Sequence, residues 1–185
     1  MRVSIIFCVF LSFIFFSCKS DYTPKPKAYF KIDFPEKKYI ILDDQKFDFS
    51  FKYPLYSELD IKPNNKFIDL DFPDFKGTLH LTYVNLKDNL SAHIEQSRSL
   101  AYKHNNQADA ISEQVFISSI DNVYGMLYDY SGVTATASQF YLTDSIKHFF
   151  RGSFYFNTEI NDSIAPINIF IKEDIRVLIE SLRWK

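Results

Sequence analysis

Cysteine and glycine are scarce in this sequence. Its 185 residues include two cysteines and four glycines, against 20 phenylalanines and 12 tyrosines. Cys8 lies inside an apolar amino-terminal run, and Cys18 comes soon after that run. The rest of the chain has no thiol, which excludes disulfides, cysteine-ligated zinc, iron–sulfur clusters and cysteine nucleophiles there. Abundant aromatics with few glycines favour a sheet-rich, well-packed globule.

An excess of charge of one sign is absent as well. With 21 Lys and Arg against 23 Asp and Glu, the formal net charge is −2, so the chain offers no basic stripe for nucleic acid. Neither G-x-G-x-x-G nor G-x-x-x-x-G-K-[ST] occurs, and nucleotide binding therefore has no support. We expect no cofactor, no nucleic-acid partner and no nucleotide.

The strongest single signal lies in the first eighteen residues. Arg2 precedes an uncharged apolar run from Val3 to Phe16, which Ser17 and Cys18 follow. This run suits the hydrophobic region of a secretory signal and is short for a membrane-spanning helix. A signal that ends in a small residue and then Cys resembles the bacterial lipoprotein signal, in which cleavage exposes the cysteine for attachment of diacylglycerol. We therefore expect residues 1–17 to be a signal peptide and Cys18 to be lipidated, with a cleaved secretory signal or an uncleaved anchor as the alternatives.

Residues 18–36 are expected to form a lipid-anchored tether and arm. Pro24 and Pro26 favour a stiff, extended backbone. The alternation in AYFKIDF predicts an edge strand, or an arm laid on the domain, that ends at Pro35. Lysines crowd this segment, and three form a candidate membrane-proximal basic surface for anionic headgroups, with solubility as the simpler role. These three are Lys25, Lys27 and Lys31.

Alternating apolar and polar residues predict several strands within residues 37–185, which we expect to form one globular domain. A strand with an aromatic face is predicted over Phe47–Tyr53, followed by a Pro- and Asn-rich loop over residues 54–65. A hairpin should come next, and three later strands should form an antiparallel meander. The hairpin strands are Ile68–Phe72 and Thr78–Val84, and the meander strands are Asn122–Tyr130, Gln139–Thr143 and His148–Phe156.

Helical periodicity occurs twice. The first helix should begin after Asp88 or Asn89, either of which can cap it, and a further turn is expected near Ile111. The second should begin after residues 161–163, any of which can cap it, with Pro166 in its first turn. The apolar stripes are Leu90, Ile94, Ser97 and Ala101 in the first helix, and Ile171, Ile175, Leu178, Ile179 and Leu182 in the second.

These elements predict an α+β fold. We expect one mostly antiparallel sheet, made of hairpins and a meander, with both helices packed on one of its faces. The element order resembles that of PsbP/Mog1-like domains, a likeness of fold that carries little functional content.

Candidate catalytic groups are few. Asp144, Ser145 and His148 could form a triad, which would make the protein a hydrolase. They lie on a predicted hairpin turn, however, and no strand–G-x-S-x-G–helix elbow accompanies them. Asp and Ser are common in turns because they form local hydrogen bonds. We therefore expect no catalytic residues.

Candidate metal ligands are equally weak. His93 and His104 lie on one helix about 16 Å apart, too far to share an ion. Asp69 and Asp71 project from one strand face but lack the dense oxygen spacing of a calcium loop. We expect no metal site and interpret these side chains as surface groups.

The stretch FYLTDSIKHFFRGSFYF carries aromatic residues on both faces of its two predicted strands. One face should pack against the core, and the other must be covered by a helix, by the arm or by a partner. On that second face Phe149, Arg151 and Tyr155 form a candidate partner surface.

Several runs of the chain, which together span most of it, indicate a family. They include YTPKPKAYFKIDFP, QFYLTDSIKHFFRGSFYFN and NDSIAPINIFIKEDIRVLIESLRWK. In these runs the chain resembles the gliding-motility lipoprotein GldD family of Bacteroidetes-type bacteria. The resemblance implies a cell-envelope lipoprotein needed for gliding motility and for the type IX secretion tied to it, with envelope motility and secretion proteins as partners. It implies no catalytic residues.

The leading hypothesis is a non-enzymatic accessory protein that faces the periplasm, is held to a membrane through Cys18 and acts by protein–protein contact. Whether that membrane is the inner or the outer one stays open. The alternative is a lipid-anchored module that binds a small molecule or envelope glycan in an aromatic cleft. A hydrolase that uses Ser145 and His148 is a third possibility, which requires the two side chains within hydrogen-bond reach.

Overall fold

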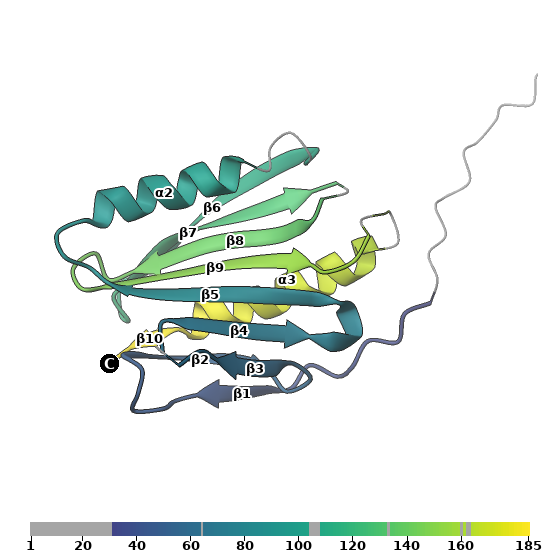
Figure 1. Cartoon of the computed structure of the whole chain (residues 1–185), viewed down its shortest axis with the longest axis horizontal. Coiled ribbons are helices and arrows are strands. Elements are labelled where there is room, and N and C mark those ends of the chain that lie inside the picture. Colours follow the sequence, from purple (N-terminus) through teal and green to yellow (C-terminus); the bar gives the residue numbers. More distant parts are fainter. Residues whose placement is uncertain (1–30, 64, 104–107, 133, 160, 162–163) are drawn as a thin grey trace, which may run out of the picture. The chain divides into compact units, whose positions relative to one another are not determined.

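A computed structural model describes residues 31–63, 65–103, 108–132, 134–159, 161 and 164–185 (Figure 1). Within it, Ile32–Lys185 form one compact unit of two antiparallel sheets and two main helices, which confirms the predicted α+β class. Seven strands make the larger sheet in the order β3-β4-β5-β9-β8-β7-β6, and three make the smaller in the order β1-β2-β10. The expectation of a single sheet is therefore wrong.

The elements have the following bounds. The smaller sheet contains β1 (Tyr39–Leu42), β2 (Phe49–Pro54) and β10 (Arg183–Trp184). The larger sheet contains β3 (Glu58–Ile61), β4 (Phe67–Phe72), β5 (Gly77–Asn85), β6 (Ala110–Ser118), β7 (Val123–Ser131), β8 (Thr136–Thr143) and β9 (His148–Phe156). The helices are α2 (Leu90–Tyr102), α3 (Ala165–Ser181) and the short 3-10 helix η2 (Pro73–Phe75). The predicted hairpin (β4–β5) and meander (β7–β8–β9) are both confirmed.

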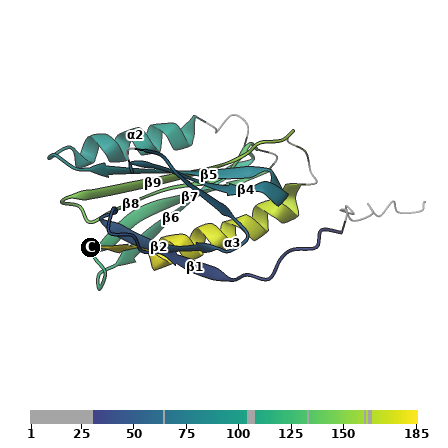
Figure 2. The same ribbon diagram turned by 60° about the horizontal axis from the view of Figure 1, so that its bottom comes forward.

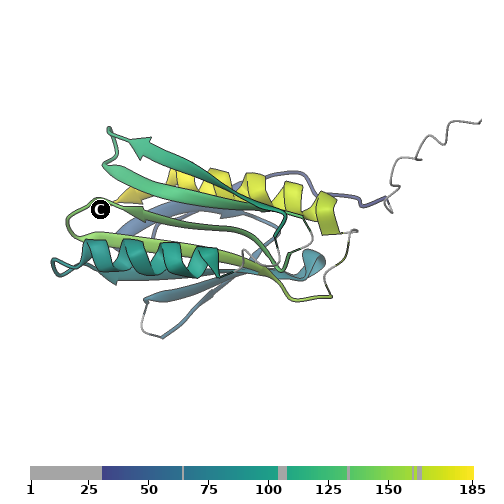
Figure 3. The same ribbon diagram turned by 90° about the horizontal axis from the view of Figure 1, so that it is seen from above.

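The two long helices lie on opposite faces of the larger sheet, which corrects the expectation that both pack on one face (Figures 2 and 3). Neighbouring residues of β9 show why. Phe150 is buried in the cluster that includes α3, whereas Phe149 is buried in a separate cluster with residues of α2. Because successive strand residues point to opposite faces, a strand with apolar residues at both positions needs cover on both sides.

Among the strands that were not predicted are β3 and β6. β3 lies within the region predicted as a loop and pairs with β4 from Glu58 to Ile61, although two of its four residues are acidic. β6 occupies the region where a further helical turn was expected, and it pairs with β7 along all of Ala110–Ser118. Both segments are strands because they pair with a neighbouring strand, and their intrinsic propensity is less important.

The side-chain cap predicted for α2 is not formed. Asn89 is the N-cap residue of α2, but its Oδ1 accepts a hydrogen bond from the backbone N–H of Lys87 instead of capping the helix. α3 begins after Ile164, which has no capping side chain, and Pro166 lies in its first turn as predicted. Of the other cap candidates, the backbone oxygen of Asn161 accepts the Ile164 N–H, and residues 162 and 163 lie outside the described part.

The main core lies between the larger sheet, β2 and α3. Phe49 and Phe51 of β2 are fully buried, and the ring of Phe49 lies 4.9 Å from that of Phe150. Each buried phenylalanine contributes roughly 1.5–3 kcal/mol from removal of its side chain from water. The apolar stripe predicted for α3 is confirmed. It consists of Ile171, Ile175, Leu178 and Ile179, with Leu182 just beyond the helix.

The scarce glycines have a packing role in this core. A Cβ atom at Gly152 would lie 2.2 Å from the ring of Phe140 on the neighbouring strand, and one at Gly77 would lie 2.3 Å from the ring of Phe154. In each case the aromatic ring occupies the space that a side chain on the adjacent strand would need. A side chain at either position would force that ring to shift within the core.

Residues 32–38 form an arm on the domain rather than an edge strand. The ring of Phe34 stacks on that of Phe170 in α3, with centroids 4.4 Å apart. Further along, Lys37 Nζ lies 2.9 Å from the Asp174 carboxylate, which is buried and also accepts hydrogen bonds from the hydroxyls of Tyr39 and Tyr56. This Lys37–Asp174 clamp ties the arm to α3.

Candidate functional site

The predicted partner surface lies on the α2 face of the larger sheet. Phe149, Arg151 and Tyr155 occupy positions of β9 that share this face. Phe149 is only 3% exposed, because it stacks on Tyr141 with ring centroids 5.5 Å apart and packs beside His93 of α2. Helix α2 thus covers the second aromatic face of β9, one of the alternatives given by the sequence. Phe149 itself is therefore not accessible to a partner.

A cleft of about 230 Å³ opens between α2 and strands β5 and β9. Its floor is formed by two cross-strand pairs, one polar and one apolar. Side chains of α2 form its wall, and Ser97 among them is buried. The lining residues are Thr82 and Val84 of β5, Phe149 and Arg151 of β9, and His93, Gln96, Ser97 and Leu100 of α2.

Arg151 is the only permanent charge in the lining of this cleft. Its Nη2 donates a hydrogen bond of 2.8 Å to the Oε1 of Gln139. Burial lowers the pKa of Arg151, and no carboxylate in the described part of the chain forms an ion pair with it. A half-buried guanidinium is usually paired with an anion. The groups beside the Arg151 guanidinium here are neutral.

The tyrosines beside Arg151 do not supply the missing negative charge. Burial raises the pKa of Tyr130, and burial also raises the pKa of Tyr155 despite the nearby guanidinium. Both phenols are therefore neutral at physiological pH. The Arg151 guanidinium keeps an unneutralised positive charge at the cleft.

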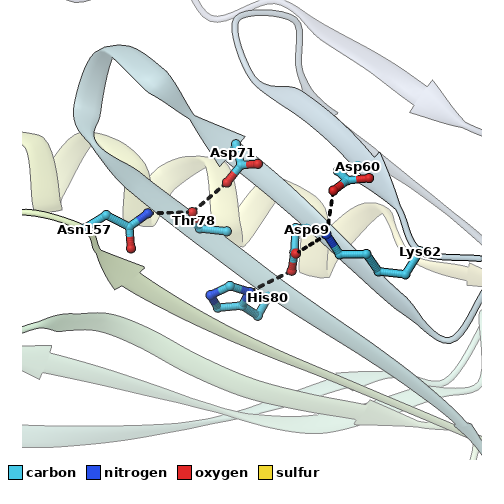
Figure 4. Close-up of polar contacts among 7 residues, drawn as sticks. All are labelled: Asp60, Lys62, Asp69, Asp71, Thr78, His80 and Asn157. Carbon is cyan, nitrogen blue, oxygen red and sulfur yellow. Dashed lines mark hydrogen bonds and ion pairs between the residues drawn. The ribbon is translucent and has the colours of Figure 1, made fainter.

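The carboxylates that could have bound a metal are engaged with protein groups on the same sheet face (Figure 4). Asp69 lies 2.7 Å from His80 Nδ1 and 3.1 Å from Lys62 Nζ. Asp71 accepts a hydrogen bond from Thr78, which in turn accepts one from Asn157. Within the described residues no group of three or more potential ligands could hold a metal ion.

The pKa of Asp69 follows from these contacts. Burial raises the pKa, but the hydrogen bonds from His80 and Lys62 outweigh it, so the pKa of Asp69 lies below its usual range. The carboxylate is thus charged and satisfied by the protein. The strip of β4 and β5 side chains is a hydrogen-bonded polar surface.

The suggested triad is not assembled. Oδ1 of Asp144 accepts the backbone N–H groups of Ile146, Lys147 and His148, which is the geometry of a closed turn. Nδ1 of His148 forms a hydrogen bond of 2.7 Å with the hydroxyl of Tyr83. Asp144 is engaged by its own turn and His148 by Tyr83 of β5, so the geometry does not favour a hydrolase based on Ser145.

Sequence reasoning missed the exposed apolar edge of the larger sheet. β6 is an edge strand of nine residues, and Val115 and Ile117 are 68% and 66% exposed. On the α2 face, a groove of about 280 Å³ is lined by these two residues together with Tyr124 and Met126. On the α3 face, a smaller hollow of about 90 Å³ is lined by Phe116 and neighbours on β7 and α3. The alternation of residues 110–118 was the signal that could have identified this edge.

The opposite edge of the same sheet is protected. β3 has four residues, and its Glu58 and Asp60 are exposed. Lys62, just after the strand, lies 2.5 Å from Asp60. Short length and charge are the usual means of preventing a sheet edge from pairing with another chain, and β6 has neither to the same degree.

Most of the residues predicted to lie near the membrane fall outside the part of the chain that the structure describes. Cys18, Lys25 and Lys27 lie outside the described residues, and Lys31 is exposed. Lys37 is committed to the clamp with Asp174. No helix in the described ranges combines the length and the apolar character needed to cross a membrane.

Comparisons with known proteins give one family and one fold. A family model described as "Gliding motility lipoprotein GldD" matches residues 19–184. Comparison with curated proteins finds no match. Among solved structures, cyanobacterial PsbP (CyanoP) from Synechocystis sp. PCC 6803 is similar, with 8% identity, a TM-score of 0.51 and coverage of 87% of this chain and 98% of that one. That likeness concerns the fold alone, and it agrees with the element order seen in the sequence.

Proposed function

The chain belongs to the gliding motility lipoprotein GldD family, and we propose that it is a non-enzymatic accessory protein of gliding motility and of the associated type IX secretion. It would be anchored through a lipid on Cys18, face the periplasm and act by protein–protein contact. The family match carries this proposal. The apolar edge at β6 and the unassembled triad support the choice of contact over catalysis.

We assign the contact to the edge of β6 and to one kind of occupant, an extended segment of a partner protein that adds as an eighth strand. Such a segment would pair with the open backbone of Ala110–Ser118, and its side chains would alternate between the two faces. The hollows on both faces of β6 provide room for these side chains. No charged residue lines the groove on the α2 face, so the segment should be apolar on that side.

The surface predicted from the sequence has a smaller part in this proposal. Arg151 and Tyr155 are half-buried, and Phe149 lies beneath α2. Partner contact at β9 would therefore be limited to the rim of the cleft.

The anchor is tested by palmitate labelling of cells that produce the wild-type chain or Cys18→Ala. We expect label and membrane association only in the wild type, and loss of gliding in the variant. Equal membrane association of both chains would remove the anchor from the proposal and leave the contact surface to be judged separately.

The contact surface is tested with a matched pair of substitutions. Ile117→Lys places a charge in the groove, whereas Ile120→Lys makes the same change three residues later at a site that is 95% exposed and beyond the strand. We expect Ile117→Lys to abolish gliding and cross-linking to envelope proteins at normal abundance of the protein, and Ile120→Lys to have no effect. Normal gliding with Ile117→Lys would contradict the assignment of the contact to β6.

A further inference from the structure

We propose that the cleft between α2 and strands β5 and β9 binds a small organic carboxylate, with Arg151 pairing with its charge. This inference goes beyond the proposed function, because the cleft lies between α2 and β9 while the proposed partner contact lies at β6. Either can fail without the other.

The cation is the first reason. Arg151 is half-buried at the cleft, and within the described part of the chain its side-chain hydrogen bond goes to the neutral amide of Gln139. A guanidinium has five N–H donors arranged to bind a carboxylate with two parallel hydrogen bonds. Gln139 uses one of these donors, so the charge and most of the donors are available for an anion.

The other polar groups of the lining suit the same ligand. Thr82 lies directly across from Arg151 on the neighbouring strand, and Gln96 lies on the opposite wall. His93 adds a donor. Because Asn89 Oδ1 accepts the Lys87 N–H, its Nδ2 donates to His93 Nε2 at 3.1 Å, and the neutral ring then carries its proton on Nδ1.

The charge balance favours a single carboxylate over a phosphate. No Asp or Glu lines the cleft, and Arg151 supplies one positive charge. A monoanion neutralises this charge, whereas a dianionic phosphate would leave an excess negative charge in a partly buried place.

The shape of the cleft limits the rest of the ligand. Val84 and Phe149 of the floor, together with Leu100 of α2, make one side of the cleft apolar. The volume of about 230 Å³ is below the roughly 300–1,000 Å³ of sites for drug-sized molecules. An aromatic or branched aliphatic acid with one carboxylate fits both limits.

The test uses the full-length chain in detergent and benzoate as the probe. Binding is measured by calorimetry and by the ¹⁵Nε–Hε signal of Arg151 in NMR spectra, with benzamide as the uncharged analogue. We expect benzoate to bind with saturation and to shift the Arg151 signal, and benzamide to bind at least about tenfold more weakly, as loss of a charge-assisted hydrogen bond implies.

Three variants complete the test. Arg151→Gln should lower benzoate affinity at least about tenfold. Gln96→Trp should block the cleft without removal of the charge, and Arg98→Gln, an exposed arginine on the same helix outside the cleft, should bind as the wild type does. Wild-type affinity in Arg151→Gln or in Gln96→Trp would overturn the proposal, as would absence of saturable benzoate binding to the wild type.

Discussion

The two faces of the seven-stranded sheet differ in what covers them. On the α3 face, β2 and α3 close an aromatic core in which Phe49, Phe140 and Phe150 are at most 1% exposed. On the α2 face, one helix covers a small cluster around Phe149 and leaves a polar strip, a cleft and an apolar groove beside it. The same strands thus form the closed core on one face and accessible polar and apolar surfaces on the other.

The largest expected difference between the faces comes from two adjacent residues of β9. Phe150→Ala should lower the free energy of unfolding by about 4 kcal/mol, because it leaves a cavity in a closed core. Phe149→Ala should cost only about 2 kcal/mol, because water can enter from the cleft beside it. Urea denaturation of the purified chain measures both. Equal losses would mean that the α2 face is as tightly closed as the other.

The second comparison concerns the clamp between the arm and α3. Asp174→Ala should cost about 3 kcal/mol, because it removes the buried partner of Lys37 and leaves two tyrosine hydroxyls unpaired. Glu173→Ala, next to it, should cost less than about 0.5 kcal/mol, because its side chain is 59% exposed. Denaturation curves for the two variants provide the measurement, and a similar small loss in both would show that the clamp adds no stability.

The smallest expected effect is a pH dependence on the polar strip of the α2 face. The pKa of Asp69 is lowered in the folded chain, so its contribution to stability is present above the unfolded pKa and is lost as the pH falls through the folded pKa. Solvent screening keeps this contribution below about 1 kcal/mol. In His80→Ala the pKa of Asp69 should rise, as carboxyl NMR titration would measure. An unchanged pKa would show that His80 does not stabilise the carboxylate.

Sequence patterns predicted both long helices and the inner strands of the larger sheet well, and its two edge strands, β3 and β6, poorly. The alternation of β4 and β5 and the stripe of α3 were strong, because the closed core requires apolar residues at regular positions. β3 and β6 carry mixed, mostly exposed residues, so only pairing with a neighbour identifies them as strands. The aromatics on both faces of β9 required cover, but sequence alone did not say that α2 would provide it.

Only part of the lining of the cleft could be predicted from the sequence, for a similar reason. Arg151 and Phe149 were identified from the sequence as members of one surface. Their neighbours Thr82 and Gln96 are far away in the chain, and no local pattern links them to β9. The helix that buries Phe149 is the same one that turns a flat surface into a cleft.

The pairing of β10 with β2 has a consequence for the order in which the protein can fold. Phe49 and Phe51 come early in the chain, yet α3 and β10, which cover them and pair with their strand, are made last. Contacts of such high sequence separation form slowly, because the intervening chain must be ordered first. During synthesis these two phenylalanines therefore lack the part of their cover that comes from α3 and β10 until residues 165–184 are present, and the apolar surface of β2 is open to non-native contacts until then.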